Sequence, residues 1–453
     1  MNILSRIHSK LGDLWWYTLL LFCVQRFADV INMVVGLWLV PKYVPQSELG
    51  AVMPLAQFAN FIGIPLAIVA IPFMKYLNVF AERHEYGKVK SLLRDVFAGT
   101  MGMMVLTLLI AWLTIPFFFE RMRVAQGSLG LLVVAVSLIG AVSTIFQNAV
   151  QGLKLYSSVV WFGLLAAPVR LAVMVVAMPF RAISGYFVGQ GAAGSVPVVG
   201  ALWALRKRLG ASVKAEPYLH EYGREMLRYT IPVAILTIAS TIYVSVEMLV
   251  IRHRLSEFES AGYYIISTFS MIASYLGAAF VTFLFPMVAG AEARGEDSLR
   301  TLKHAIVGTL GAGGLISLAF LVFGKFILGL TPVWKTYQGL SFEMFLLCVY
   351  NVLTAVVNCL TTYEVAQGRF RFLRYFLPVF TVKMILTYCL TGYTFFNGLV
   401  PDRWLAVLSD FNPNRLKVLL IIFIGFHLLI IPIFLIDVLG KYHERKKARE
   451  PGK

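Results

Sequence analysis

The sequence reads AERHEYGKVKSLLRDVFAGT over residues 81–100 and AEARGEDSLRTLKHAIVGT over residues 291–309. A single-residue gap aligns the two stretches, and each one follows a long apolar segment. Upstream of them, SELGAV at residues 47–52 faces ESAGYY at residues 259–264. Both matches recur at an offset of about 210 residues, as expected when a unit of several helices has been duplicated. The sequence therefore predicts two related halves.

Apolar segments long enough to cross about 30 Å of hydrocarbon run along most of the chain. Of the 453 residues, 59% are hydrophobic and only 14% are charged, and the mean hydropathy is +0.77. These values exclude an ordinary soluble domain. We expect an all-α polytopic membrane protein with about 12 transmembrane helices in two six-helix halves. The expected spans are 14–40, 49–74, 95–118, 128–151, 158–179, 183–204, 229–251, 261–289, 304–329, 341–363, 373–395 and 416–438.

The expected domains are an N-terminal six-helix bundle at 1–210, a cytoplasmic linker at 211–228, and a C-terminal six-helix bundle at 229–453 with a basic cytoplasmic tail. The linker is polar and contains Pro217, which suits a connection between two bundles that move relative to each other. Twelve spans place both termini on one side of the membrane. A cytoplasmic placement leaves about 26 of the 40 Lys and Arg residues on the cytoplasmic side, as the positive-inside rule requires.

The formal charge of +17 follows from these membrane-flanking loops, so nucleic acid is not an expected partner. The four cysteines lie in apolar segments without CxxC spacing, and no metal site or cofactor is expected. No GxxxxGK[ST], HExxH or GxSxG motif occurs, so neither ATP binding nor hydrolysis is indicated. A G-x-G-x-x-G at Gly189, Gly191 and Gly194 lies inside a span, and with Gly185 it also forms GxxxG, which favours close helix packing over nucleotide binding.

Charged side chains inside a membrane cost several kcal/mol unless they face protein or water, so their positions mark a cavity or a path. Arg26 and Asp29 are three residues apart on one face of the first span. They either bind an anionic substrate group and a proton or sodium ion, or form a structural ion pair that fixes helix packing. Arg170 follows a proline that kinks the fifth span. Glu247 extends a polar stripe in the seventh span. Lys383 lies near the middle of the eleventh span, with no acidic residue in the same helix.

Uncharged polar residues form stripes at helical spacing in the fourth and tenth spans. Such stripes either line a hydrophilic cavity or join helices by hydrogen bonds, and the pattern leaves both interpretations open. A lone His427 in the last span is more typical of structural hydrogen bonding and is left out of the expected site. The stripes are Thr144, Gln147, Asn148 and Gln151, and Asn351, Thr354, Asn358 and Thr361.

The helix count, the duplicated halves and several local stretches together resemble the multidrug/oligosaccharidyl-lipid/polysaccharide (MOP) exporter superfamily, in particular its Wzx-type polysaccharide flippases. These stretches are QRFADVINMVVGLWLV, SELGAV and AERHEYGKVKSLL in the first half, with ESAGYY and AEARGEDSLRTL in the second. The resemblance extends over the whole chain, and none of the stretches is a catalytic signature. It implies a MOP-type, MATE-like fold in the bacterial inner membrane, with both termini cytoplasmic.

The resemblance also implies flipping of a lipid-linked oligosaccharide for polysaccharide or lipopolysaccharide biosynthesis, by alternating access between the halves. The implied partners are an undecaprenyl-diphosphate-linked oligosaccharide, membrane lipids and other polysaccharide-assembly membrane proteins. The alternatives are a MATE-like cation-coupled drug or ion antiporter and, less favoured, a membrane enzyme acting on lipid-linked sugars, with Asp402, Arg403, Asp410 and Arg415 in its outer loop. The expected substrate-binding residues are Arg26, Arg170, Lys383, Gln147 and Asn358, and the expected ion-coupling residues are Asp29 and Glu247.

Overall fold

The computed structural model describes residues 20, 22–122, 127–153, 155–209, 214–293, 298–390 and 415–449. Within these ranges all regular secondary structure is helical and no strand occurs, so the all-α prediction is confirmed. Nine helices in the described part are long and apolar enough to cross a membrane. The outer loop with Asp402, Arg403 and Asp410 lies outside the described residues, as does the end of the basic tail.

One of the nine, helix α8 (Tyr156–Leu209), contains two spans rather than one. Its 54 residues would make a straight helix about 80 Å long, more than twice the thickness of the hydrocarbon core. The backbone breaks at Ala182, where φ is 39° and ψ is −116°. This break falls between the predicted spans 158–179 and 183–204. Counting α8 twice, and adding α10 and α14, gives the predicted number of about 12.

The two segments of α8 fold back against each other as an antiparallel hairpin, which two glycines make possible. A Cβ added to Gly185 would lie 2.6 Å from the backbone nitrogen of Met178, and one added to Gly189 would run into the side chain of Met174. As the glycine number rises, the partner number falls, which defines antiparallel packing. The close helix approach predicted from the GxxxG spacing is therefore confirmed.

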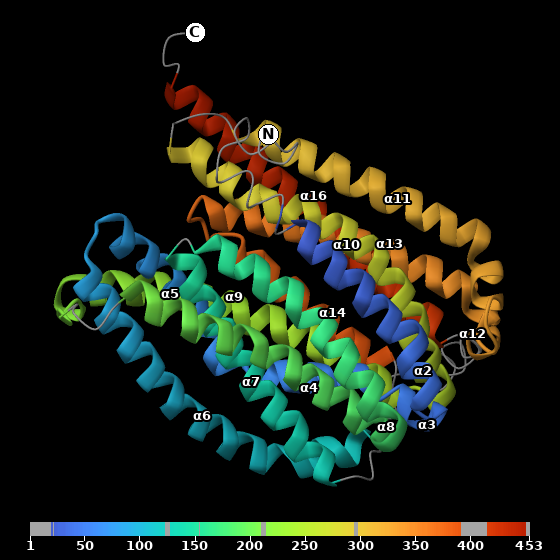
Figure 1. Ribbon diagram of the computed structural model, residues 1–453. Coiled ribbons are helices and arrows are strands. Elements are labelled where there is room, and N and C mark those ends of the chain that lie inside the picture. Colours follow the sequence, from blue (N-terminus) through green and yellow to red (C-terminus); the bar gives the residue numbers. More distant parts are fainter. Residues whose placement is uncertain are drawn as a thin grey trace, which may run out of the picture. The chain divides into compact units, whose positions relative to one another are not determined.

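The chain divides into two compact units, Met1–Leu249 and Val250–Lys453. In the first unit α7 is the central helix, because α4, α5, α6 and α8 all pack on it (Figure 1). The predicted division at linker 211–228 stays a prediction. The elements of this unit are the span Phe22–Tyr43, which includes η1 (Val35–Leu39) and α2 (Val40–Tyr43), then α3 (Gln46–Leu49), α4 (Val52–Ile62), α5 (Ile64–Glu82), α6 (Tyr86–Met122), α7 (Gly127–Gly152), α8, and α9 (Leu219–Arg254) as far as the unit boundary at Leu249.

In the second unit the central helix is α13, which packs on α10, α11 and α16. The three helices are drawn in yellow, gold and red in Figure 1, with α13 in orange. Apolar side chains of α13, including Leu347, Val356 and Leu360, are almost fully enclosed there. The elements are α10 (Glu257–Ala293), α11 (Leu299–Gly329), α12 (Pro332–Lys335), η2 (Gln338–Leu340), α13 (Ser341–Ala366), α14 (Leu373–Leu390) and α16 (Arg415–Arg449).

The described part of the predicted linker is fixed onto the first unit. The Glu216 amide donates to the Gly87 carbonyl over 3.2 Å, and Lys88 Nζ lies 2.6 Å from a carboxylate oxygen of Glu221. Residues 214–222 therefore pack against the turn between α5 and α6, rather than hanging free. Any movement of the linker has to break these contacts first.

An aromatic cluster secures the same contact. Phe80 is fully enclosed, and its ring lies 5.9 Å from that of Tyr218 and 5.0 Å from that of Tyr222, both in edge-on arrangements. Burial, with the neighbouring Asp95 carboxylate, raises the pKa of Tyr218 to about 12. The Tyr218 hydroxyl thus stays protonated at neutral pH and can donate to that carboxylate.

Candidate functional site

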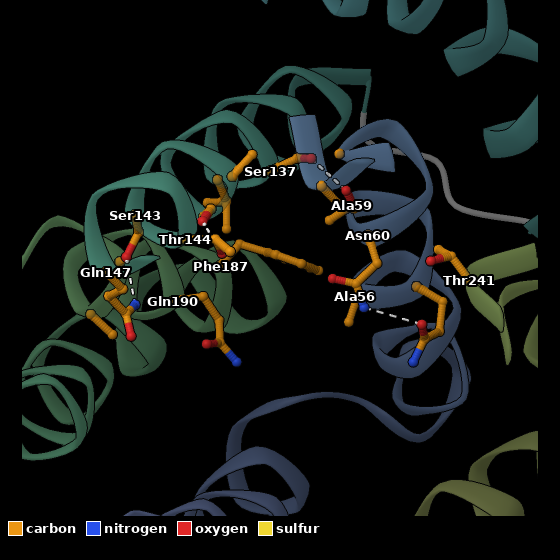
Figure 2. Close-up of a pocket in the computed structure, with 18 of the residues that line it drawn as sticks. Ala56, Ala59, Asn60, Ser137, Ser143, Thr144, Gln147, Phe187, Gln190 and Thr241 are labelled. Carbon is orange, nitrogen blue, oxygen red and sulfur yellow. Dashed lines mark hydrogen bonds between the residues drawn. The ribbon is translucent and has the colours of Figure 1, made fainter. Parts of the chain in front are cut away.

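The first unit contains a cavity of about 860 Å³, within the size range of small-molecule binding sites. Its wall is built by α4, α7, α8 and α9, with one residue from α5. Figure 2 shows Gln147 and Gln190 extending from α7 and α8 into the same space, with Asn60 on α4 facing them. The cavity therefore lies along the side of the central helix α7.

The wall carries nine polar side chains and no charged one among the described residues that line it. Most of the remaining wall residues are alanine and glycine. Among the described residues that line the cavity, Phe187 is the one aromatic residue. Amides and hydroxyls both donate and accept hydrogen bonds, so the wall can match a ligand with many hydroxyl groups. The polar wall residues are Gln57, Asn60, Ser137, Ser143, Thr144, Gln147, Gln190, Ser240 and Thr241.

Hydrogen bonds to neighbours hold the amide side chains in place. Gln147 donates to the Ser143 hydroxyl over 3.1 Å, and Gln190 donates to the Tyr186 hydroxyl over 2.9 Å. Each bond joins residues four apart on one helix, so it fixes the side chain without bridging the cavity. A carbonyl oxygen has two lone pairs and an amide has two N–H groups, so a ligand can still bind these side chains.

Gln147 is the one expected substrate-binding residue found in this wall. Arg170 lies four residues after the wall residue Ala166 on α8, and Glu247 lies three residues after Val244 on α9. Residues three and four apart share one face of a helix. Arg170 and Glu247 are therefore one turn away from the cavity, along the helices that build it.

Arg26 and Asp29 neutralise each other in the first span. Their side chains form an ion pair, with Nη2 and Oδ2 separated by 2.9 Å. The guanidinium also lies 5.4 Å above the centre of the Phe22 ring. The span packs on α8, because a Cβ added to Gly163 would lie 2.8 Å from Val24. The predicted internal pair thus exists.

Lys383 lies in the second unit, enclosed by aromatic side chains. Its side chain is 3% exposed, and Nζ donates to the hydroxyl of Tyr350 over 3.3 Å. The same nitrogen lies 4.2 Å from the centre of the Phe423 ring. Aromatic faces stabilise a cation at such distances. Three helices, α13, α14 and α16, contribute to this arrangement.

The polar stripe of α13 is used partly for packing. Asn351 donates to Ser270 of α10 over 2.9 Å, and Thr354 lies 3.2 Å from Nε2 of His427 on α16. Asn358, an expected substrate-binding residue, is exposed on the surface of its unit. His427, left out of the expected site, is thus a neighbour of the expected residue Lys383 through Tyr350.

Sequence reasoning missed Gln190 and Thr241 as wall residues. Gln190 lies between Gly189 and Gly191, and these small residues were interpreted only as packing contacts. Packing brings α8 close to α7: a Cβ added to Gly191 would lie 3.3 Å from Val136, and one added to Gly194 would meet Ile139 of the same helix. The sequence signal that could have identified this wall residue is the single amide side chain of Gln190, placed between two glycines where two helices pack closely.

No protein family model matches the chain, and no curated protein sequence matches it significantly. Solved structures do match it. An inward-facing multidrug resistance MATE family transporter of the MOP superfamily shares 13% identity with a TM-score of 0.62, over 92% of this chain and 98% of that one. A MATE transporter in a bent conformation shares 15% identity with a TM-score of 0.59, over 96% and 97% of the two chains.

A third match is a MOP superfamily transporter from Pyrococcus furiosus, for which a reverse polarity of the binding pocket suggests a different function. It shares 12% identity with a TM-score of 0.58, over 96% of this chain and 98% of that one. At such identities the likeness concerns the fold. The chain therefore has the fold of MOP superfamily transporters, as the sequence resemblance implied.

Proposed function

We propose that the protein translocates a lipid-linked oligosaccharide across a bacterial inner membrane by alternating access. The observation that carries this proposal is the uncharged cavity of the first unit, with its nine amide and hydroxyl side chains. Sugar hydroxyls both donate and accept hydrogen bonds, and so do the amide and hydroxyl side chains of the wall, such as Asn60, Gln147 and Gln190. A cationic aromatic drug would instead favour acidic or aromatic walls.

The diphosphate of the carrier lipid needs a cation. Arg170 is the best placed of the expected residues, because it lies one helical turn from the wall residue Ala166. A guanidinium can bind two phosphate oxygens at once. Arg26 is less available, since Asp29 already pairs with it at 2.9 Å. The polyprenyl tail stays in the lipid while the sugar enters the cavity.

The cycle follows the fold. The two units open toward the cytoplasm, where the carrier-linked sugar is made, and then toward the outer side. Both termini are placed in the cytoplasm in this scheme, as the distribution of Lys and Arg favours. Other polysaccharide-assembly membrane proteins then supply and remove the substrate. Asn358, exposed on α13 of the second unit, is a further polar group for the sugar to contact.

The test is translocation of an undecaprenyl-diphosphate oligosaccharide in proteoliposomes, scored by the fraction of sugar that a membrane-impermeant enzyme reaches. We expect flipping by the wild type and a loss of about tenfold or more in the double variant Gln147→Leu, Gln190→Leu, because each lost hydrogen bond costs roughly 1 kcal/mol. Gln338→Leu, an amide of the second unit that bonds to the Lys325 carbonyl, is the matched control and should flip normally.

A MATE-like cation-coupled antiporter is the second candidate. It is favoured by two buried carboxylates of the first unit, Asp29 and Glu247, because such groups bind protons or sodium ions. Uptake of a fluorescent cationic drug into vesicles with a proton or sodium gradient distinguishes the antiporter from the flippase. Gradient-driven drug uptake that disappears in Glu247→Gln, without flipping of any lipid-linked sugar, would replace the flippase proposal with this one.

A further inference from the structure

Two basic side chains of the second unit meet at one tyrosine. Lys383 donates to the Tyr350 hydroxyl over 3.3 Å, and the imidazole of His427 meets the Tyr350 ring edge-on, with 5.0 Å between ring centres. Lys383 and His427 are 3% and 5% exposed. Both are thus withdrawn from solvent at membrane depth, where ionisable groups are rare and usually functional. The proposed sugar cavity of the first unit does not use them.

The hydrogen bonds of His427 fit two protonation states. Its Nδ1 lies 2.8 Å from the carbonyl of Phe423, and a carbonyl only accepts, so Nδ1 carries a hydrogen. Its Nε2 lies 3.2 Å from the Thr354 hydroxyl, which in turn lies 3.0 Å from the Tyr350 carbonyl. The threonine has one hydrogen to donate. The Thr354 hydroxyl donates to Nε2 when the ring is neutral, and to the Tyr350 carbonyl when Nε2 is protonated.

Lys383 has a reversible partner of the same kind. A charged ammonium donates to the Tyr350 hydroxyl, whereas a neutral amine accepts from it. The rings of Tyr350 and Phe423, with centres 4.9 and 4.2 Å from Nζ, favour the charged form. Each base therefore has a hydroxyl neighbour that can turn around, and no heavy atom has to move when a proton arrives or leaves.

The other charged groups near this cluster lie farther along its helices. The carboxylates of α13 and α16 are seven or more residues from Tyr350, Thr354 and His427, which corresponds to about 10–15 Å. Two charged bases would therefore face each other at low dielectric, and we expect one to be charged at a time. Among the described residues of the helices that pack here, the other polar and titratable groups are Glu343 with Lys417 at 3.9 Å, Asp437 with Tyr375 at 3.3 Å, the buried Glu364 and Thr387, and the neutral pairs Asn351–Ser270, Cys348–Ser317 and Cys359–Thr309.

We propose that Lys383 and His427, joined by Tyr350, form a proton-binding site inside the second unit. The site holds a single proton, on Lys383 while that lysine is present, and Tyr350 and Thr354 orient their hydroxyls to match. The ligand is the proton itself, so the site needs no further cation. This inference holds for a sugar flippase and for a drug antiporter alike, since it concerns the unit that lacks the described cavity.

The experiment is nuclear magnetic resonance of the full chain in lipid, with ¹⁵N-labelled histidine. His427→Gln identifies the His427 signals among the seven histidines of the chain. In the wild type we expect these signals to stay in the neutral form across the range in which exposed histidines titrate, because Lys383 holds the proton. In Lys383→Met the imidazole is expected to take up the proton as the pH falls. Lys303→Met, an exposed lysine of α11, is the matched control and should behave as wild type.

Identical His427 titration in wild type and Lys383→Met overturns the proposal. Tyr350→Phe keeps the ring and removes only the hydroxyl, so it tests the same link if Lys383→Met does not fold. It should shift the His427 signals in the same direction as Lys383→Met, by a smaller amount, and unchanged signals also count against the site. The readout needs no substrate, so failure of the proposed function leaves this test intact.

Discussion

The central helices of the two units, α7 and α13, differ at one decisive position. In each helix one threonine is hydrogen-bonded to the residue one turn earlier, which is Gly140 before Thr144 in α7 and Tyr350 before Thr354 in α13. Thr144 and Thr354 make the same bond, each donating over 3.0 Å to the carbonyl four residues earlier. A Cβ added to Gly140 would find nothing within 4 Å. Tyr350, by contrast, carries a large side chain that is only 6% exposed.

This difference shows how one polar stripe serves two purposes. In the first unit the glycine leaves the stripe facing an open cavity, so Gln147 is available to a ligand. In the second unit Tyr350 is buried, and both Lys383 and His427 contact it. The hydroxyl stripe is alike in both helices. The residue one turn before the threonine, Gly140 or Tyr350, determines whether the stripe faces a cavity or packed side chains.

The largest expected effect comes from giving the first unit the residue of the second. Gly140→Tyr places a ring in the cavity and should reduce flipping of lipid-linked sugar to background, because bound sugar and ring compete for the same volume. Flipping is measured in proteoliposomes as above. Gly102→Tyr on α6, where an added Cβ also meets nothing within 4 Å, is the control and should flip normally. Normal flipping by Gly140→Tyr would show that the cavity is not the sugar path.

The next prediction concerns the second unit, where removing the polar groups around Tyr350 should change the free energy of unfolding. Tyr350→Phe removes the hydroxyl that accepts from Lys383 and should lower the free energy of unfolding by about 1.5–3 kcal/mol, the usual range for a bond to a charged group. Lys383→Met should cost less, because it removes the enclosed charge together with its need for a partner. In the double variant the two losses should not add. Chemical unfolding in detergent measures all three, with Thr381→Val on the exposed face of α14 as control, and additive losses would contradict the coupling.

Two asparagines on α13 distinguish packing from ligand contact within one helix. Asn351→Ala breaks the bond to Ser270 and should lower stability by about 1 kcal/mol. Asn358→Ala, at an exposed position, should leave unfolding unchanged and lower flipping a few-fold. Unfolding and flipping are measured on the same preparations. A stability loss at Asn358, or an unchanged flipping rate, would remove this residue from the substrate path.

The smallest effect is expected at the fixed linker. A Cβ at Gly87 would lie 2.6 Å from the Glu216 side chain, so Gly87→Leu should loosen residues 214–218. Because that side chain can move aside, we expect only a few-fold faster cleavage by an added protease. Gly99→Leu, on the same helix with nothing within 4 Å, should be cleaved as slowly as wild type. Equal rates for both variants would mean that the contact does not hold the linker.

Much of the fold was predictable because its signals are local. Hydropathy gave the spans, and the two spans 158–179 and 183–204 were separated correctly, because the helical backbone breaks between them at Ala182. The GxxxG spacing at Gly185 and Gly189 indicated close packing, which the hairpin contains. The pair Arg26 and Asp29 could be predicted from a spacing of three residues on one helix.

The sequence by itself determined that this chain is an all-helical membrane protein with about 12 spans, because length, hydropathy and helical period depend only on neighbouring residues. Only the tertiary structure decided which polar residues meet. Gln147 and Gln190 are far apart in the chain, and they line one cavity because glycines bring α8 against α7. Lys383 and His427 meet at Tyr350 because three helices pack around its ring. Contacts between helices depend on the register of packed side chains, which no local pattern specifies.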